Sequence, residues 1–496
     1  MIQHCPVLIV LLPLTAALLC LLFSKFNKNL GSWLVIGSIA GSLACSLQVL
    51  HQTLTSGEAI HYWMGNWAPP LGIEFVIDPL SAVMAVLITF ISLMVALYSK
   101  PFMRNEDWLH IGGYYTLYGL LTLGLCGMVI TGDVFNLYVY LEVMSLSGYG
   151  LIAMGGRKSM LAAFRYMLIG TIGASLYLLA VAYLYAMTGT LNMADLGARI
   201  MPYLSSPPFA LAVACLFIGF GIKMALFPLH GWQPDAYNFA HPGSAAFIAG
   251  VMSKVPAYAI IRFFFYIFGV NNPIIGTALT VLGILGIGGV LIGSVMALAQ
   301  YDFRRMLAYS SVAQIGYIAI GLAIGNMYGF IGAVLHIINH AFMKSALFLF
   351  VGVIQYRFGE INLYRLGGLN KKMTLSTITV TLAALSMVGI PPTAGFFSKW
   401  YLMLGAYQGG QYFYIVVLVI SSLLNAIYFF RILEQMFVQH EASLTEINRH
   451  EGKLGLPPEM AIPIFCAGIG ILVLGFYSVD IVNDILKSGL PEVFLR

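Results

Sequence analysis

Apolar stretches of about 20 residues recur along the whole chain, and they constrain its fold more than any other feature. A hydrocarbon core about 30 Å thick needs roughly 20 apolar residues per helix. The 496 residues are 60% hydrophobic and only 9% charged, whereas ordinary soluble domains are about a quarter charged. We therefore expect one all-α membrane bundle, rather than a soluble domain with an anchor.

Polar and Gly/Pro clusters divide the chain into about fourteen expected spans. They lie near 5–23, 31–53, 78–98, 111–130, 133–153, 160–187, 208–229, 243–268, 273–298, 304–323, 327–355, 374–409, 411–437 and 459–479. The first run has no preceding Lys or Arg and no small-residue cleavage pattern, so we interpret it as a span and not a signal peptide. A small hairpin is expected within 57–78, and a short interfacial helix at 191–203.

Lys and Arg residues are distributed unequally between alternate loops. If the N-terminus lies outside, the inner loops contain fourteen of them and the outer segments four. Because loops on the cytoplasmic side collect Lys and Arg, this bias predicts a multi-pass protein of the bacterial cytoplasmic (inner) membrane with both termini outside.

Cofactor motifs are missing from the sequence. The six cysteines lie far apart, without a CxxC or Cys/His cluster, and neither a P-loop nor a GxGxxG after a strand is present. We therefore expect no cofactor and no metal site in this chain, and any redox centre would belong to a partner.

Six basic residues remain inside the expected spans. They are Arg165, Lys223, Lys254, Lys344, Lys399 and Arg431. A lysine at the bilayer centre costs about 2.5 to 3.5 kcal/mol, so such residues usually face a partner or a wet cavity. Arg165 could pair with Glu142 or reach the surface, whereas Arg431 is expected to pair locally with Glu434.

Glu142 is the one acid deep in a span. It lies nine residues in, or roughly 13 Å at 1.5 Å per residue. A carboxylate in low dielectric takes up a proton or needs a nearby cation, so Glu142 is a candidate proton site. The alternative is a structural ion pair. Asp133, at the outer end of the same span, is expected to cap the helix.

Prolines interrupt two spans close to lysines. Pro228 follows Lys223, and Pro391 and Pro392 precede Lys399. Helices broken at membrane depth are tolerated beside cavities or buried protein, and transporters place ion sites there. The alternative for Lys223 is a kinked helix with the lysine snorkelling to the surface.

The position of the two breaks predicts two inverted five-helix repeats. An odd number of spans per unit reverses the orientation of the second unit. The first repeat would cover 111–268 and the second 269–437, with three spans and the outer hairpin at 1–110 and one span at 438–496.

The remaining ionisable residues form a candidate relay. Lys254 lies about eleven residues into its span, or roughly 16 Å, which is too deep for snorkelling. His336, His340 and Lys344 recur at every fourth position and so share one helix face, which suits proton transfer. The alternative is that the histidines are satisfied core residues.

Several segments resemble the antiporter-like subunits shared by Mrp-type cation/proton antiporters, respiratory complex I and membrane-bound hydrogenases. They are YLEVMSLSGY, FPLHGWQPDAY, MSKVPAYAIIR, YDFRRMLAYSSVAQIGY and HIINHAFMKSALF. The resemblance implies that Glu142 and Lys223 are a coupled acid and base, that Lys254 is the central relay and that Lys399 is the terminal site. The length and Lys399 make the chain most similar to the D-type subunits of Mrp antiporters.

Two functions follow from these expectations. The first is a proton-translocating subunit of a multisubunit Na+/proton antiporter, which is a transporter and not an enzyme. The second is a proton-pumping subunit of a redox-driven complex, with the catalytic centre on other chains. Both imply other membrane subunits as partners, and a purely structural scaffold is the third interpretation.

Overall fold

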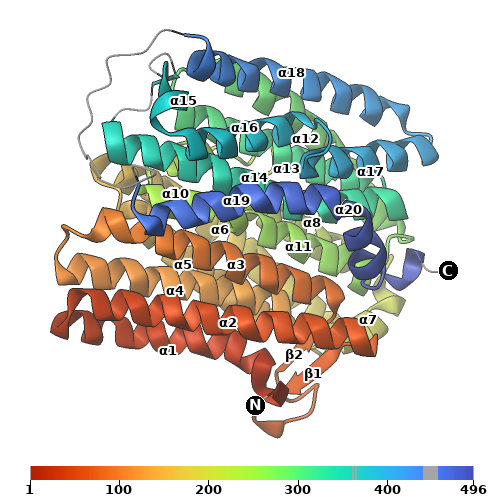
Figure 1. Ribbon diagram of the computed structural model, residues 1–496. Coiled ribbons are helices and arrows are strands. Elements are labelled where there is room, and N and C mark those ends of the chain that lie inside the picture. The colour runs from red at the N-terminus through yellow and green to blue at the C-terminus, as the bar shows by residue number, and fades with distance from the viewer. Residues whose placement is uncertain (1, 360–361, 364–365, 440–455, 495–496) are drawn as a thin grey trace.

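The structure is a computed structural model that describes residues 2–359, 362–363, 366–439 and 456–494. Long helices lie side by side and run across the molecule between two ends (Figure 1). They are α1 (Cys5–Phe26), α2 (Lys28–Ser56), α3 (Pro79–Met103), α4 (Trp108–Ile130), α5 (Val134–Ala153), α6 (Arg157–Thr188), α8 (Pro207–Met224), α12 (Pro273–Leu298), α13 (Phe303–Ala323), α14 (Met327–Phe358), α16 (Thr374–Val388), α17 (Ala394–Gln408), α18 (Tyr412–Phe437) and α19 (Pro458–Phe476).

The expected all-α membrane fold is confirmed. In the described part of the chain, 12 helical segments are long and apolar enough to cross a membrane. Helix α5 and the interrupted pair α16 and α17 complete the expected set of about fourteen spans. Short helices accompany them: α7 (Met193–Arg199), α9 (Gln233–Phe239), α15 (Leu369–Lys372) and α20 (Ser478–Asp480).

Glycines allow some of these helices to pack closely. Helices α12 and α13 meet where Gly286 faces Gly316, and a Cβ built on Gly316 would lie 2.5 Å from the Gly286 carbonyl oxygen. A larger residue at Gly316 would therefore force the two helices apart. Small residues at such crossings let membrane helices gain close van der Waals contact.

Two helices are interrupted at the places that the prolines predict. Helix α8 ends at Met224 and α9 resumes the path at Gln233, whereas α16 ends at Val388 and α17 begins at Ala394. The residue after the first of each pair has a left-handed conformation, with φ of 60° at Ala225 and 94° at Gly389. The chain leaves each helix at this residue.

The helical segment that carries Lys254 is the most enclosed part of the bundle. It consists of α10 (Pro242–Phe247), a π-helical turn η4 (Ile248–Met252), α11 (Lys254–Ile261) and a second π-helical stretch η5 (Arg262–Ile267). It packs against α3, α4, α8 and α14. Single π-helical turns inside α-helices occur frequently at functional sites, and the sequence pattern did not predict them.

Short elements gather at one end of the bundle, on the right of Figure 1. The expected hairpin is formed by β1 (Ile60–Trp63) and β2 (Glu74–Ile77), which pair antiparallel. The expected interfacial helix is α7. The buried Glu74 accepts a hydrogen bond from Asn192 Nδ2 at 2.6 Å, which ties the hairpin to the segment before α7.

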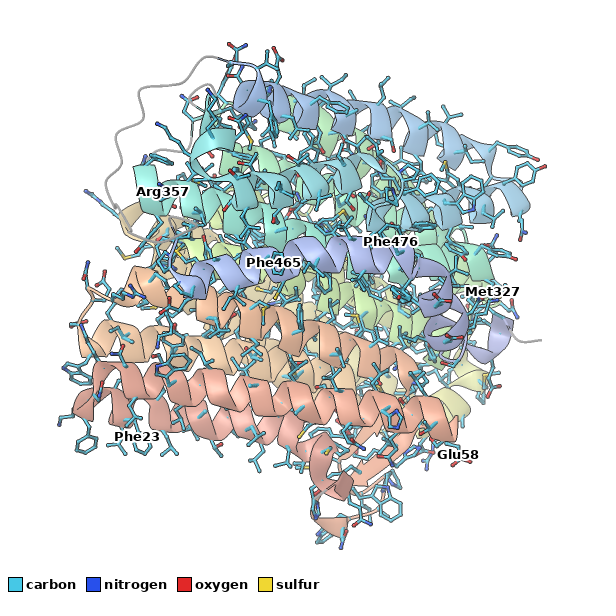
Figure 2. The ribbon with its side chains drawn as sticks, in the orientation of Figure 1. Phe23, Glu58, Met327, Arg357, Phe465 and Phe476 are labelled. Atoms are coloured by element: carbon cyan, nitrogen blue, oxygen red, sulfur yellow. The ribbon has the colours of Figure 1, made fainter. Side chains whose placement is uncertain are left out.

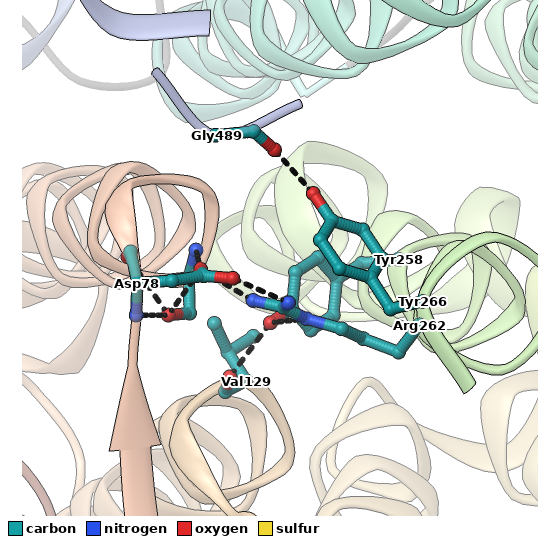
Figure 3. Close-up of polar contacts among 7 residues, drawn as sticks. Asp78, Val129, Tyr258, Arg262, Tyr266 and Gly489 are labelled. Carbon is teal, nitrogen blue, oxygen red and sulfur yellow. Dashed lines mark hydrogen bonds and ion pairs between the residues drawn. The ribbon is translucent and has the colours of Figure 1, made fainter. Parts of the chain in front are cut away.

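The same end contains a two-pronged ion pair between Asp78 and Arg262 (Figure 3). Tyr258 OH accepts from Arg262 Nε at 2.6 Å and donates to the Val129 carbonyl at 2.9 Å. Burial by itself opposes ionisation of Asp78, but the Arg262 guanidinium holds the pKa of this carboxyl below its ordinary value. Tyr266 OH donates to the Gly489 carbonyl. The ion pair and this hydrogen bond together join the start of α3, η5 and the C-terminal segment.

Labelled residues show how the chain alternates between the two ends. Phe23 and Arg357 lie at one end of the bundle in Figure 2, and Glu58 and Met327 lie at the other. This is the alternation expected when each helix crosses once. We name the end with Phe23 and Arg357 the inner end, and the opposite end, with the hairpin, the outer end.

Candidate functional site

The first helix break places Lys223 against helix α5. Lys223 is 1% exposed, and its Nζ donates to Ser145 Oγ at 2.6 Å and to Tyr149 OH at 3.1 Å. The carbonyl of Ile222, near the break, accepts from Trp232 Nε1 at 2.9 Å and from the Ala225 backbone N–H at 3.2 Å. The lysine is therefore buried and does not snorkel, and its partners are hydroxyls of α5.

Glu142 lies one turn before Ser145 on the same face of α5. It is half-buried, and no ion pair joins it to a basic residue among the described residues. The charge of Glu142 nevertheless acts on Lys223 through space. The resemblance implies that Glu142 and Lys223 are a coupled acid and base, and in the structure the Ser145 hydroxyl, not the Glu142 carboxylate, contacts the lysine.

Lys254 is completely buried at the centre of the bundle. Its Nζ donates to the Ala249 carbonyl in the π-helical turn η4, and Ser253 Oγ lies 3.4 Å away. A π-helical turn leaves carbonyls out of the regular ladder, so the irregularity in η4 supplies the acceptor for the ammonium. The sequence predicted that Lys254 lies too deep to snorkel, and its complete burial confirms this.

Helix α9 contributes polar groups between the first break and Lys254. Tyr237 interacts with Ser253 and accepts a hydrogen bond from Gln233 Nε2 at 2.9 Å. Gln233 is buried, and its Oε1 has no hydrogen-bond partner in the described segments of the chain. These side chains were missed because they stand outside the charged set on which the sequence-based prediction depends.

The face of α14 carries three buried groups, as predicted. His336 Nδ1 contacts Ser398 Oγ, and its Nε2 contacts Gln314 Oε1, both at 3.0 Å. The rings of His336 and His340 stack with centroids 5.9 Å apart. Lys344 Nζ donates to the Leu307 carbonyl at 2.8 Å.

His340 bears on the alternative that the histidines are satisfied core residues. It is fully buried, and neither ring nitrogen has a hydrogen-bond partner among the described residues. Lys254, Lys344 and His336 all act on it electrostatically. Buried polar atoms are normally paired, so His340 is not a satisfied core residue, whereas His336 has a partner at each ring nitrogen.

The second helix break holds Lys399 with the carbonyls that it frees. Lys399 Nζ donates to the carbonyls of Met387 and Val388, both at 2.9 Å, and to Ser422 Oγ at 3.1 Å. The ammonium also lies 5.0 Å from the centre of the Tyr317 ring. The end of the broken helix therefore supplies carbonyl acceptors for a buried ammonium group.

The two arginines left within spans have structural partners. Arg165 Nη1 pairs with Asp235 Oδ2 at 3.1 Å, and not with Glu142. The expected pair of Arg431 with Glu434 is wrong, because Arg431 donates to the carbonyls of Leu298 and Gln300 at 3.1 and 2.9 Å. A guanidinium can donate its hydrogen bonds to backbone carbonyls at a helix end instead of to a carboxylate.

Helix α5 begins as predicted, with Asp133 as its cap. Asp133 Oδ1 accepts from the Asn136 backbone N–H at 2.6 Å. This contact fixes the start of the helix that carries Glu142 and Ser145.

Buried lysines beside interrupted helices are typical of multi-pass membrane proteins that transport ions. Ionisable residues inside spans are expensive, and they mark ion pathways in multi-pass membrane proteins. Two family models match the chain. Residues 131–425 match the one described as NADH:quinone oxidoreductase/Mrp antiporter, TM, and residues 63–110 match NADH-ubiquinone oxidoreductase (complex I), chain 5 N-terminus. The chain belongs to the NADH:quinone oxidoreductase/Mrp antiporter family of membrane subunits.

Similar proteins come from both branches of this family. The chain is 44% identical to NADH-quinone oxidoreductase subunit N of Desulforudis audaxviator, over 99% of each chain. It is 31% identical to the D-type subunit of the Na(+)/H(+) antiporter of Alkalihalophilus pseudofirmus, over 99% of this chain and 98% of the relative. The resemblance predicted from the motifs is confirmed at the level of the family.

Solved structures of multisubunit membrane complexes share the fold. A chain of the archaeal membrane-bound sulfane sulfur reductase matches with a TM-score of 0.90 and 28% identity, over 99% of this chain and 98% of that chain. A chain of the Mrp complex from Dietzia sp. DQ12-45-1b matches with a TM-score of 0.86 and 26% identity, over 99% and 97%.

Proposed function

We propose that this chain is the proton-translocating subunit of a multisubunit membrane complex. The observation that carries the proposal is the set of four buried lysines, Lys223, Lys254, Lys344 and Lys399, none of which has an ion-pair partner among the described residues. Permanently charged and unpaired groups at this depth would cost several kcal/mol each. Groups that gain and lose protons avoid that permanent cost.

The proposed path begins at Glu142 and Lys223. The Ser145 hydroxyl lies 2.6 Å from Lys223 Nζ, one helical turn after Glu142, and can both donate and accept a hydrogen bond, so it can accompany a proton that moves between acid and base. Removing the influence of Glu142 would leave Lys223 without a nearby anion, and a buried ammonium then tends to release its proton.

The path continues through the cluster around Lys254. His340 and His336 connect it to Lys399, because Lys254 acts on His340, and Lys399 acts on His336. Imidazoles can take up and release protons near neutral pH. Lys344 supports the cluster from the next turn of α14, and Lys399 is the terminal site.

The helix breaks give this path its two ends. We propose that the segments 111–268 and 269–437 act as inverted repeats, with Pro228 interrupting the first and Pro391 and Pro392 the second. The segments 1–110 and 438–496 would flank them. Each break frees backbone carbonyls at membrane depth, and in the second repeat these carbonyls bind the lysine directly.

The chain would lie in a bacterial cytoplasmic membrane with both termini outside. The inner end, where Phe23 and Arg357 lie in Figure 2, contains the loops with most of the Lys and Arg residues. The positive-inside rule then places this end in the cytoplasm.

The relatives suggest what drives the protons. Identity of 44% to a protein named NADH-quinone oxidoreductase subunit N favours a redox-driven complex, in which other chains transfer the electrons. The alternative is a sodium/proton antiporter, which is supported by 31% identity to a D-type antiporter subunit and by the Mrp complex fold. On this identity we propose the redox-driven complex first and the antiporter second, whereas the sequence motifs had favoured the antiporter.

Isolation of the native complex tests the proposal. Mass spectrometry of the co-purifying chains would identify redox or small antiporter subunits. Inside-out vesicles would then be energised by an electron donor or by a sodium gradient while their internal pH is followed. We expect donor-driven acidification that persists without sodium and is lost in Lys223→Ala. An assembled Lys223→Ala complex that acidifies at the wild-type rate with either driving force would contradict proton translocation through this chain.

A further inference from the structure

A cavity of about 630 Å³ opens at the inner end of the bundle. It lies between the turn after α3, the turn after α5, the residues that precede α10, and the facing ends of α13 and α14. A second cavity of about 500 Å³ adjoins it, and the two share Gly155, Phe239, Arg304 and Gln355. None of the proposed relay residues lines either cavity.

Arg304 is the unusual residue in the wall of both cavities. It is 5% exposed, and its Nη1 donates to the Asn238 carbonyl at 3.1 Å. Its Nε and Nη2 have no hydrogen-bond partner within the part of the chain that the structure describes. The neighbouring Asp302 accepts from the Arg305 backbone N–H at 2.9 Å, in the role of helix cap. A buried guanidinium with unused donors is costly unless a further acceptor satisfies it.

The two unused donors have a defined geometry. Nε and Nη2 lie along one edge of the planar guanidinium, so their N–H bonds are nearly parallel. This edge fits two oxygens of a single anion, as in bidentate arginine–phosphate pairs. The free part of Arg304 is therefore the part that recognises a phosphate group.

Other basic groups line the cavities. Arg157 and Lys158 border the smaller one, and His110 borders the larger one. Arg104 also lines the larger cavity but pairs with Glu459 at 2.8 Å. The lining includes the carboxylates Glu106 and Asp302, so positive charge exceeds negative charge.

His241 lines the larger cavity and lies near Arg304. Its Nδ1 accepts from the Gly243 backbone N–H at 3.3 Å. Burial, and then the charges of Arg304 and His110, lower its pKa to about 3. His241 is therefore neutral at physiological pH, chiefly because it is buried, and the positive charge of the nearby Arg304 adds to this effect.

We propose that this inner cavity binds a phosphate-bearing anion, with the Nε and Nη2 edge of Arg304 as its main ligand and Lys158 and Arg157 at its rim. The phosphate could belong to an anionic phospholipid of the inner leaflet or to a dissolved phosphate. Both present the same paired oxygens to the guanidinium. The proposal does not depend on proton translocation, because no relay residue takes part.

The test measures bound phosphate on the purified complex. In the lipid arm, native mass spectrometry counts phospholipids retained after delipidation and after return to nanodiscs of phosphatidylglycerol or phosphatidylcholine. In the soluble arm, inorganic phosphate is titrated calorimetrically into the delipidated complex. A retained anionic lipid assigns the site to the bilayer, whereas saturable phosphate binding assigns it to a dissolved anion, and either result supports the proposal.

Matched variants make the assignment specific. Arg304→Gln should weaken binding at least tenfold, and Arg304→Lys should restore only part of it, because a lysine keeps the charge but not the two-pronged edge. Arg157→Gln with Lys158→Gln should weaken binding several-fold and decides the matter if Arg304→Gln does not assemble. Arg199→Gln, at the outer end, is the control and should bind normally.

Two outcomes would overturn the proposal. One is equal binding by the wild type and by the variants that assemble in both arms, including the absence of binding in all of them. The other is a cross-link in the intact complex that joins a partner's acidic side chain to residues of this cavity, since a protein carboxylate would then satisfy Arg304.

Discussion

The two interrupted helices hold their lysines in different ways. Lys223 lies before its break and donates to two hydroxyls of α5, with Glu142 close enough to act on it. Lys399 lies after its break and donates to two carbonyls at the freed end of α16 and to Ser422. The same device, a helix broken by proline, thus produces two different environments.

The difference teaches how one motif can serve two steps. A hydroxyl can donate or accept, so it tolerates both the protonated and the neutral form of a lysine. Carbonyls only accept, and they favour the ammonium. Under the proposed relay, Lys223 is suited to switch its proton and Lys399 to hold one until the path beyond it opens.

Loss of either lysine tests whether both environments serve transport. We expect Lys223→Ala and Lys399→Ala each to lower proton transport about a hundredfold, which is the usual scale for removing an acid–base group. The measurement is proton flux into vesicles that contain the assembled complex. Lys25→Ala, an exposed lysine at the inner end, is the control and should transport normally. Flux above half the wild-type value in either variant would mean that the two breaks are structural.

Removal of one hydroxyl from each lysine sharpens the comparison. Ser145→Ala leaves Lys223 with a single hydrogen-bond partner, Tyr149, whereas Ser422→Ala leaves Lys399 with both carbonyls. A hydrogen bond to a charged group contributes about 1.5 kcal/mol or more, so we expect about a tenfold loss of flux for Ser145→Ala and about twofold for Ser422→Ala. Equal losses would show that the two environments do not differ in the way described.

Substitutions of the left-handed residues at the two breaks should have the smallest effect of these changes. Gly389 has φ of 94°, and an added Cβ would lie 3.0 Å from Lys399 Cδ. Ala225 already has a side chain at φ of 60°. Left-handed backbone costs a non-glycine residue about 1 to 2 kcal/mol, so Gly389→Ala should lower the Tm of the purified complex, and Ala225→Gly should leave it unchanged or raise it. A higher Tm for Gly389→Ala would rule out this explanation of the breaks.

Much of the candidate site could be predicted because charged residues are rare in segments that lie in lipid. A lysine or glutamate within an apolar stretch is conspicuous, which is why Lys254, Lys399 and the face of α14 were found from the sequence. Prolines stop helices by their own chemistry, so both breaks were predicted to within a few residues. The hairpin and α7 followed from similar local signals.

The missed features depend on which distant helices meet. Ser145 and Tyr149 are ordinary residues until the Lys223 side chain of α8 reaches them on α5, and both helices pack against α6. Arg304 belongs to the loop arginines in the sequence, yet it is buried between two cavities. The π-helical turn before Lys254 has no sequence signal that we recognised. All of these features depend on how distant helices pack together, and the local sequence pattern does not carry that information.

Lys254 provides the most direct test of the central claim, because it is fully buried and its hydrogen-bond partners among residues 2–359, 362–363, 366–439 and 456–494 are only the Ala249 carbonyl and Ser253. The measurement is proton flux through the assembled complex carrying Lys254→Met, a substitution that keeps the length of the side chain and removes its proton. The relay predicts that the complex assembles and that its flux through this chain is lost. Wild-type proton flux in Lys254→Met would show that protons do not pass along these residues.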